Sequence, residues 1–212
     1  MPGYNEEKHI DNSIRDVLKY TNNLVVVDDG SSDRTEEFAK KRSKNVLRHK
    51  INLGKGAGLK TGVEYAIKQG AKRVAFIDSD GQHEAKELPN FFRELDKGYD
   101  IVFGYRKLDK KMPFTFRLGN FMLSTAINIL FHIKLQDTQS GYRAMTIDAY
   151  NKIHWKSTDY SVESEMIANA GKKKLKYKEI PISTIYHDVN KGTTVFNGIK
   201  IMIDMLKHRI KN

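Results

Sequence analysis

Short runs of β-branched residues alternate with amphipathic stretches along the first two-thirds of the chain. The runs predict buried strands at residues 24–27, 46–47, 74–77 and 101–103. Apolar residues at helical spacing predict helices over residues 5–20 and 58–69, and capping residues open another at 32–35. Strands that alternate with helices are typical of an α/β fold with a mostly parallel sheet flanked by helices.

The first strand of this pattern is truncated almost to nothing. The chain opens with Met1, Pro2 and Gly3 and then enters the first predicted helix, with no apolar run before it. In an alternating α/β pattern, a loop that enters a helix in this way normally follows a strand. The sheet is therefore expected to lack one central strand, or to be completed by something outside this sequence.

Two of the predicted strands end in acidic turns that contain glycine. Asp28 and Asp29 precede Gly30, and the segment Asp78-Ser79-Asp80 precedes Gly81. Because parallel α/β sheets bind ligands beyond the carboxyl ends of their strands, both turns are expected to face the same crevice.

The second acidic turn carries the residue types that hold a hard divalent cation. The carboxylates of Asp78 and Asp80, with the amide oxygen of Gln82, fit around Mg²⁺ or Mn²⁺, and water and a diphosphate would complete the coordination. The alternative is a turn with helix-capping aspartates. The first acidic turn favours the metal site, since one of its carboxylates can bond a nucleobase or ribose while the other shapes the turn.

A glycine-rich segment at residues 52–58 precedes a predicted helix. It lacks the spacing of a phosphate-binding P-loop, and no dinucleotide-binding fingerprint follows the strand at 24–27. We interpret the segment as a loop packed closely beside a nucleotide. Lys55 either lies near phosphate or belongs to a tight loop that needs the flexibility of glycine.

Composition narrows the classes of partner. The 212 residues carry a formal net charge of +11, which attracts nucleic acid, anionic lipid headgroups or small phosphorylated substrates. The sequence has neither basic segments interleaved with aromatic residues nor a helix-turn-helix signature, so nucleic acid is not an expected partner. Because there is no cysteine, oxygen or imidazole ligands must hold any metal. The chain as given is expected neither to cross a membrane nor to carry an export signal.

Six segments, in this order, resemble family 2 glycosyltransferases. They are Tyr4-Asn5-Glu6-Glu7, Val27-Asp28-Asp29-Gly30-Ser31, Asn52-Leu53-Gly54-Lys55-Gly56, Asp78-Ser79-Asp80-Gly81-Gln82-His83, Gly104-Tyr105-Arg106 and Asp137-Thr138-Gln139-Ser140-Gly141-Tyr142-Arg143. The fourth and sixth segments are most similar to those of dolichyl- or polyprenyl-phosphate hexose synthases, of the dolichol-phosphate mannose synthase type. The resemblance runs from Pro2 to about Gly192.

The resemblance implies a GT-A-type fold, with a catalytic domain over residues 1–194 and an amphipathic C-terminal helix over 195–212. The nucleotide-sugar donor is expected to contact Pro2, Tyr4, Glu6, Val27, Asp29, Asp78, Ser79, Asp80 and Arg106. The expected metal ligands are Asp78, Asp80 and Gln82, with Asp80 and Gln82 foremost. The acceptor phosphate is expected to contact Arg117, Ser140 and Arg143, because a planar guanidinium suits a pair of phosphate oxygens.

The reaction implied is a metal-dependent, inverting transfer of a hexose from a GDP- or UDP-linked sugar to polyprenyl or dolichyl phosphate. The candidate catalytic residues are Asp80, Asp137, Arg117 and Arg143. Because a phosphate is already an anion at neutral pH, no strong general base is required, and Asp137 or Glu165 would orient groups. Two alternatives stay open. One is a transferase of the same fold that acts on a sugar hydroxyl of a polysaccharide or glycolipid, with Asp137 as the base, and the other is a non-catalytic nucleotide-sugar-binding protein.

Two segments depart from the family pattern on the acceptor side. An arginine that several of these synthases carry before the position of Arg117 is replaced here by the stretch Lys110-Lys111-Met112-Pro113. A late loop bearing an arginine and a Ser-Lys pair reads differently at residues 186–194, where Lys191 is the candidate substitute.

Two apolar helices bear on the membrane. The predicted helix at 118–133 is too short for a span, so it is either a core helix or one that rests in the headgroup layer. The closing helix, from about residue 195 to 210, has the composition of an interfacial anchor, and packing on the sheet is its alternative. The expectation is a cytoplasmic protein associated peripherally with the cytoplasmic face of a membrane.

Overall fold

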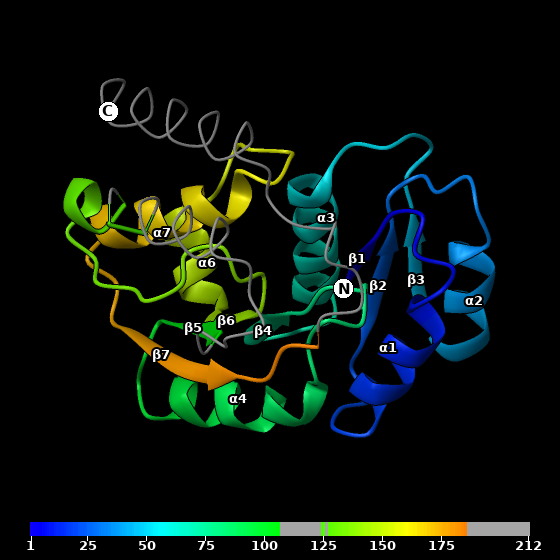
Figure 1. The fold of residues 1–212 in the computed structure, drawn as a ribbon, viewed down its shortest axis with the longest axis horizontal. Helices are drawn as coiled ribbons and strands as arrows, with labels where there is room; N and C mark the ends of the chain where they lie inside the picture. The colour runs from blue at the N-terminus through cyan, green and yellow to red at the C-terminus, as the bar shows by residue number, and fades with distance from the viewer. Residues whose placement is uncertain (107–123, 126, 186–212) are drawn as a thin grey trace.

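The computed structural model describes residues 1–106, 124–125 and 127–185 of the chain (Figure 1). In chain order the elements are β1 (Pro2–Gly3), α1 (Ile10–Leu18), β2 (Val25–Asp28), α2 (Thr35–Arg42), β3 (Asn45–Arg48), α3 (Lys55–Lys68), β4 (Arg73–Phe76), a 3₁₀ turn (Ala85–Glu87), α4 (Leu88–Asp96), β5 (Ile101–Arg106), β6 (Arg143–Thr146), α6 (Ile147–Ile153), α7 (Val162–Lys172) and β7 (Tyr177–Ile182). Residues 124–131, apart from 126, are also helical.

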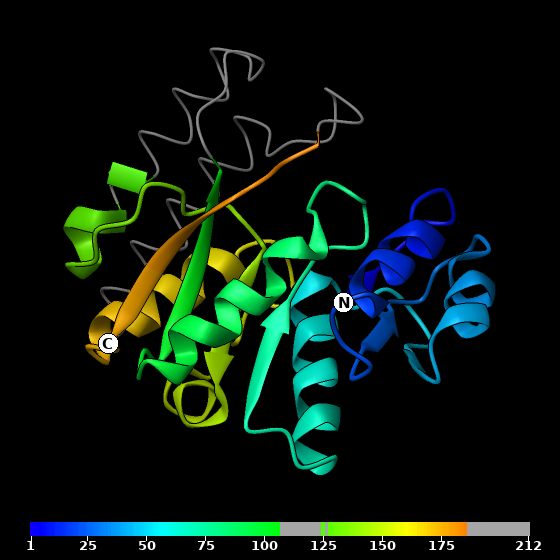
Figure 2. The ribbon, with the colours of Figure 1, turned by 90° about the horizontal axis from the view of Figure 1, so that it is seen from below.

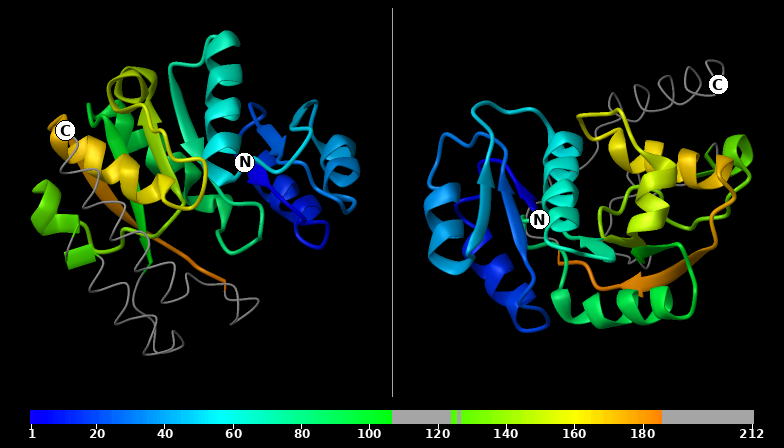
Figure 3. Two further views of the ribbon diagram at one scale, coloured as in Figure 1. Left: turned by 90° about the horizontal axis from the view of Figure 1, so that it is seen from above. Right: turned by 180° about the vertical axis from the view of Figure 1, so that it is seen from behind.

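The strands form two sheets that lie on either side of α3 (Figure 3). The first has the order β1-β2-β3 and is parallel throughout. The second has the order β4-β6-β5-β7, in which β6 runs antiparallel to both of its neighbours while β5 and β7 are parallel. The predicted α/β fold with a mostly parallel sheet flanked by helices is therefore confirmed, and β6 is the reversed strand among those described.

The truncated first strand is present as two residues. Pro2 pairs with Val27 and Gly3 with Asp28 in parallel register, so β1 forms the edge of the three-stranded sheet. The described strand is thus as short as the sequence predicts. Its two residues lie beside the end of β2.

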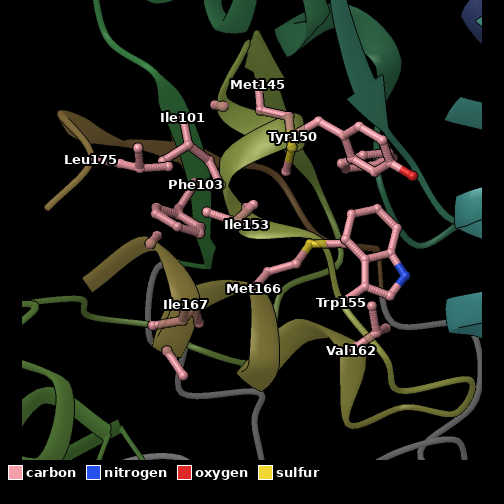
Figure 4. Close-up of a cluster of buried hydrophobic side chains, with 14 of the residues drawn as sticks. Ile101, Phe103, Met145, Tyr150, Ile153, Trp155, Val162, Met166, Ile167 and Leu175 are labelled. Carbon is pink, nitrogen blue, oxygen red and sulfur yellow. The ribbon is translucent and has the colours of Figure 1, made fainter. Parts of the chain in front are cut away.

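Helices cover both faces of the four-stranded sheet (Figures 1 and 2). Ile101 and Phe103 of β5 pack into a core with α6 and α7, and Val102 between them packs into a second core with α4. Figure 4 shows the first core, to which Met166 and Ile167 of α7 contribute together with Ile101 and Phe103 of β5. Strands buried on both faces are apolar at successive positions, which explains the continuous apolar run of β5.

Two helices begin at different residues from those predicted. The first begins at Ile10 rather than at residue 5, because Asn5 takes a left-handed conformation with φ of 53° and belongs to the preceding turn. The helix predicted over 58–69 begins earlier, at Lys55, directly after Gly54 with φ of 95°. Lys55 is thereby the first residue of a helix rather than part of a loop.

The described part of the helix predicted at 118–133 presents two kinds of surface. Ile127 and Phe131 are buried in the core, whereas Ile129 between them is 68% exposed. Residues 107–123 and 186–212 lie outside the described residues, and with them Arg117, Lys191 and the whole predicted closing helix. Over the part of the chain that the structure describes, no helix has the length and apolar character needed to span a membrane.

Candidate functional site

The two acidic turns meet through the glycine-rich loop. Asp29, at the end of β2, accepts hydrogen bonds from the backbone N–H of Leu53 at 3.0 Å and of Gly54 at 2.7 Å. The next residue, Lys55, places Nζ 2.8 Å from Oδ1 of Asp78, in the second turn. One dipeptide therefore contacts both carboxylates and brings the two acidic turns close together. That both turns face one crevice stays a prediction.

Close backbone packing explains the glycines of this loop. A Cβ on Gly56 would lie 2.2 Å from the carbonyl oxygen of Ser157, far inside contact distance. The Gly56 N–H donates to the Thr158 carbonyl at 2.7 Å, and the Trp155 indole N–H donates to the Gly56 carbonyl at 3.0 Å. The segment is thus closely packed, and its packing partner is the segment 155–158, whereas its place beside a nucleotide stays a prediction.

The second turn holds two carboxylates in contrasting states. Burial works against the charged form of Asp78, but the attraction of Lys55 outweighs it and keeps the pKa of Asp78 below its usual range. Burial first, and repulsion from Asp78 second, raise the pKa of Asp80. Asp80 also accepts a hydrogen bond from the backbone N–H of Gln82 at 2.9 Å. A partly buried carboxylate beside a second carboxylate favours a neighbouring cation.

These residues fit a hard divalent cation as part of its ligand set. Among the described residues, no group of three acidic or histidine side chains could hold a metal ion alone. Asp78, Asp80 and Gln82 offer only oxygen ligands, which Mg²⁺ and Mn²⁺ prefer. A site of this kind takes its remaining ligands from water and substrate phosphates, as Mg²⁺ commonly does.

The predicted nucleoside contacts lie around β1 and the turn that follows it. Pro2 and Val27 are register partners, and a Cβ on Gly58 of α3 would lie 3.2 Å from Cβ of Pro2. Tyr4 is 46% exposed, and the backbone N–H of Glu6 donates to the Thr35 hydroxyl at 2.8 Å. The four predicted contacts Pro2, Tyr4, Glu6 and Val27 therefore lie near the carboxyl end of β2, as Asp29 does.

Asp29 is 2% exposed, and both of its carboxylate oxygens contact other residues of the chain. Besides the two backbone donors, its Oδ1 lies 2.6 Å from Nδ1 of His49. This geometry makes Asp29 the residue that holds the loop over 53–54, and its direct contact with a nucleoside stays a prediction. His49 was not anticipated from the sequence, where nothing but its place just after β3 distinguishes it.

Arg106, an expected donor contact, forms a two-pronged ion pair with Asp137. Nε of Arg106 lies 2.6 Å from Oδ2 of Asp137, and Nη2 lies 3.0 Å from Oδ1. Burial opposes ionisation of Asp137, which is 2% exposed, but Arg106 holds its pKa below the usual range. In this arrangement Asp137 is an ionised anchor for Arg106, and the predicted phosphate contact of Arg106 stays a prediction.

Arg143 is fully buried and donates to three backbone carbonyls. Its guanidinium reaches the carbonyl oxygens of Ser140 at 2.9 Å, Glu163 at 2.6 Å and Thr138 at 3.0 Å. Burial lowers its pKa to about 10, so it stays charged at neutral pH. The geometry favours a role in shaping the loop 138–143 over direct contact with a phosphate. The predicted acceptor contacts of Ser140, which is also buried, and Arg143 stay predictions.

Two buried glutamates of α7 complete the site. Glu165 accepts backbone hydrogen bonds from Lys156 at 2.9 Å and Ser157 at 2.8 Å and so holds the segment that packs on Gly56. Glu163, which no motif indicated, places Oε1 2.6 Å from Nζ of Lys55. The available signal was two acidic residues spaced two apart at the start of an otherwise apolar helix.

The sequence comparison decides the family. The model of the family described as Glycosyl transferase family 2 matches residues 1–154. The chain belongs to glycosyltransferase family 2. The fold of this family 2 glycosyltransferase is of GT-A type, and it is similar to glucosyl-3-phosphoglycerate synthase from Mycobacterium tuberculosis, solved in complex with Mn²⁺, UDP-glucose and phosphoglyceric acid. That similarity has a TM-score of 0.74 at 19% identity and covers 98% of this chain and 77% of the other.

Two archaeal relatives match this family 2 glycosyltransferase along almost its whole length. An uncharacterized protein of Methanocaldococcus jannaschii is 40% identical over 220 residues, covering 99% of this chain and 90% of the relative. The UDP-N-acetylglucosamine--dolichyl-phosphate N-acetylglucosaminyltransferase of Methanococcus voltae is 32% identical over 233 residues, covering 97% and 93%. The resemblance to dolichyl-phosphate sugar transferases is thereby confirmed.

Proposed function

We propose that this family 2 glycosyltransferase moves a sugar from a nucleotide-sugar to a polyprenyl or dolichyl phosphate with the help of Mg²⁺ or Mn²⁺. The observation that carries the proposal is that one dipeptide, Gly54-Lys55, contacts both acidic turns. Gly54 binds Asp29 on one side, and Lys55 binds Asp78 on the other. The relative from Methanococcus voltae, whose name specifies a UDP-linked donor and a dolichyl-phosphate acceptor, supports the same pair of substrates.

The donor is held in two parts in this proposal. The nucleoside lies against Pro2, Tyr4, Glu6 and Val27, and its diphosphate lies beside Ser79 and the carboxylates of Asp78 and Asp80. The cation, held by Asp78, Asp80 and Gln82, would offset the negative charge that develops on the departing nucleoside diphosphate. A UDP-sugar is the donor we expect, because the relative just described uses one by name. The sugar is left to experiment.

The acceptor phosphate attacks the anomeric carbon from the face opposite the leaving group, which inverts its configuration. A phosphate oxygen that is already charged needs no proton removed. This agrees with Asp137, whose two oxygens are paired with Arg106 rather than open to a hydroxyl group. Transfer to a sugar hydroxyl would instead require a carboxylate base.

A lipid-linked acceptor brings the protein to a membrane surface. The formal net charge of +11 is attracted to the anionic cytoplasmic leaflet. In the described helical residues at 124–131, apart from 126, Ile129 is 68% exposed. Its apolar side chain suits the headgroup layer. We therefore place the protein at the cytoplasmic face of a membrane, bound peripherally.

The test is direct synthesis of the lipid product. The protein is incubated with Mn²⁺, a short-chain polyprenyl phosphate and, in separate samples, UDP-N-acetylglucosamine, UDP-glucose and GDP-mannose, and the lipid phase is analysed for a sugar-phospholipid. We expect a product with one of the UDP-sugars. The Asp80→Ala variant should lose activity by about 100-fold or more while keeping the thermal melting curve of the wild type.

Three other outcomes would contradict the proposal in different ways. Release of nucleoside diphosphate only with a glycan acceptor would favour transfer to a hydroxyl, and loss of that activity in Asp137→Asn with donor binding intact would identify the base. Donor binding without release of nucleoside diphosphate under any condition would favour a non-catalytic binding protein. Full activity of Asp80→Ala would remove the metal turn from the mechanism.

A further inference from the structure

Three charged side chains from distant parts of the chain meet next to the metal turn. Nζ of Lys55 lies 2.8 Å from Oδ1 of Asp78 and 2.6 Å from Oε1 of Glu163. The exposed fractions of the three side chains are 16%, 22% and 8%. Lys55 begins α3, Asp78 follows β4 and Glu163 lies in the first turn of α7, so this triad joins three separate elements.

The surrounding backbone holds the triad in place. A Cβ on Gly141 would lie 2.5 Å from Oδ2 of Asp78 and 2.8 Å from Nζ of Lys55. The loop 138–143 therefore packs directly on both groups. The guanidinium of Arg143 binds the backbone carbonyl of Glu163 at 2.6 Å. Movement of the Lys55 side chain would disturb this packing, and Arg143 holds the backbone of Glu163.

The triad has an excess of negative charge. Among these three side chains two carboxylates share one ammonium, which leaves them a formal charge of −1, and the carboxylate of Asp80 and the buried guanidinium of Arg143 lie near them. Without Glu163, Lys55 would neutralise Asp78 alone. The second carboxylate therefore leaves part of the negative charge of Asp78 available to a cation.

A purely structural role does not account for three buried charges. Replacing a buried ion pair or triad by apolar side chains is often neutral or stabilising, so charges that persist beside a functional turn call for another reason. Groups that contact metal ligands orient them and tune their affinity. Lys55 and Glu163 stand in that relation to Asp78.

We propose that Glu163 is a positioning residue for the metal turn, acting through Lys55, which it shares with Asp78. This inference rests on the proposed function, since it assumes that Asp78 and Asp80 receive a divalent cation with the donor diphosphate. It assigns to α7, on the acceptor side, a part in donor binding. It also gives Lys55 a role between two carboxylates rather than on a phosphate.

The first test measures Mn²⁺ binding in the presence of UDP, without acceptor and without turnover. The Glu163→Gln substitution changes the formal charge of the triad from −1 to 0, and we expect the affinity for Mn²⁺ to fall about tenfold or more. The control is Glu64→Gln on α3, which makes the same charge change at a side chain 56% exposed. Free Mn²⁺ is followed by electron paramagnetic resonance, and we expect wild-type affinity in the control.

The second test restores the charge without the contacts. In the double variant Lys55→Gln/Glu163→Gln the triad again carries −1, from Asp78 alone. We expect its Mn²⁺ affinity to return toward the wild-type value, while turnover of donor stays low because Asp78 has lost the partner that orients it. The double variant leaves Asp78 without its cationic partner, and it carries the test even where Glu163→Gln does not fold, because a Mn²⁺ affinity about tenfold below that of the wild type would then contradict the inference.

Two results would overturn the inference. One is a folded Glu163→Gln protein with wild-type Mn²⁺ affinity, and the other is a double variant that binds Mn²⁺ as weakly as Glu163→Gln. Mn²⁺ binding by the wild-type protein tests the metal site of the proposed function separately. If wild-type protein fails to bind Mn²⁺ with UDP, the metal site and the inference fall together, whereas wild-type binding that Glu163→Gln leaves unchanged removes the inference alone.

Discussion

Two buried carboxylates of this transferase, Asp29 on the expected donor side and Asp137 on the expected acceptor side, use their charge differently. Asp29 accepts hydrogen bonds from the backbone N–H of Leu53 and Gly54. Asp137 also accepts backbone hydrogen bonds, from Arg106 and Gln139, but in addition it forms a two-pronged ion pair with the guanidinium of Arg106.

This difference has a physical consequence. A carboxylate that accepts backbone N–H groups shapes a loop and needs no partner of opposite charge. A buried ion pair depends on both members, because removing one leaves the other charged and unpaired in a poorly solvated place. Asp137 should therefore tolerate a charge-removing substitution less well than Asp29.

The largest effect is expected from Asp137→Asn. The substitution leaves Arg106 beside a neutral amide where it had a two-pronged ion pair, and the aspartate side chain is only 1% exposed. We expect the free energy of unfolding to fall by about 3–5 kcal/mol, measured by urea denaturation. The matched control is Asp96→Asn, which breaks the surface ion pair of Arg73 with a carboxylate 63% exposed and should cost less than about 1 kcal/mol. Equal losses in the two variants would contradict the comparison.

The positions of the two acidic turns could be predicted from the sequence because their signals are local. Asp29 directly follows β2 and Asp80 lies four residues after the end of β4, so the ends of apolar strands place both turns. The mostly parallel sheet followed from the alternation of strands and helices. These features need no knowledge of which residues meet across the fold.

The acceptor side could not be predicted in the same way. The role proposed for Glu163 depends on its ion pair with Lys55, which lies in another element far away in the sequence. Arginine is seldom fully buried, so an arginine in a family motif was interpreted as a phosphate ligand rather than as the buried donor that Arg143 is. Strand β6 begins at this same arginine, which hides a short reversed strand from hydrophobic patterning.

A smaller effect is expected when the pH is lowered, on the difference in unfolding free energy between the wild type and Asp137→Asn. The folded-state pKa of Asp137 is held below its unfolded value, so its contribution to stability is complete above that unfolded value of about 3.9 and is lost as the pH falls through the folded pKa. The difference in unfolding free energy between wild type and Asp137→Asn should therefore be constant near neutral pH and shrink below about pH 4. Urea titrations from neutral to acid pH measure it. A difference that grew on acidification would show that the pair does not hold Asp137 ionised.

The next effect concerns the loop that the two sides share. Gly56→Ala places a Cβ 2.2 Å from the Ser157 carbonyl oxygen, so the backbone of one segment must move. We expect a loss of about 1–3 kcal/mol in unfolding free energy, as for other overpacked sites. UDP binding should weaken as well, since the loop that carries Gly54 and Lys55 shifts. Calorimetric titration with UDP checks the second part, and unchanged affinity would uncouple the acceptor-side packing from the donor site.

The smallest effect is expected at another glycine of the same helix. A Cβ on Gly62 would lie 3.4 Å from Cγ2 of Val27, at ordinary contact distance, and the residue sits in the interior of α3. Alanine is preferred over glycine at such a position by about 0.5–1 kcal/mol, so Gly62→Ala should stabilise the protein by roughly that amount and leave UDP affinity unchanged. Thermal melting and the same titration measure both. Opposite signs at Gly56 and Gly62 would locate the sensitivity in the contact with 157–158, because both substitutions add the same methyl group to one helix. A loss of stability at both positions would instead mean that α3 as a whole is too tightly packed against the first sheet to accept any added volume.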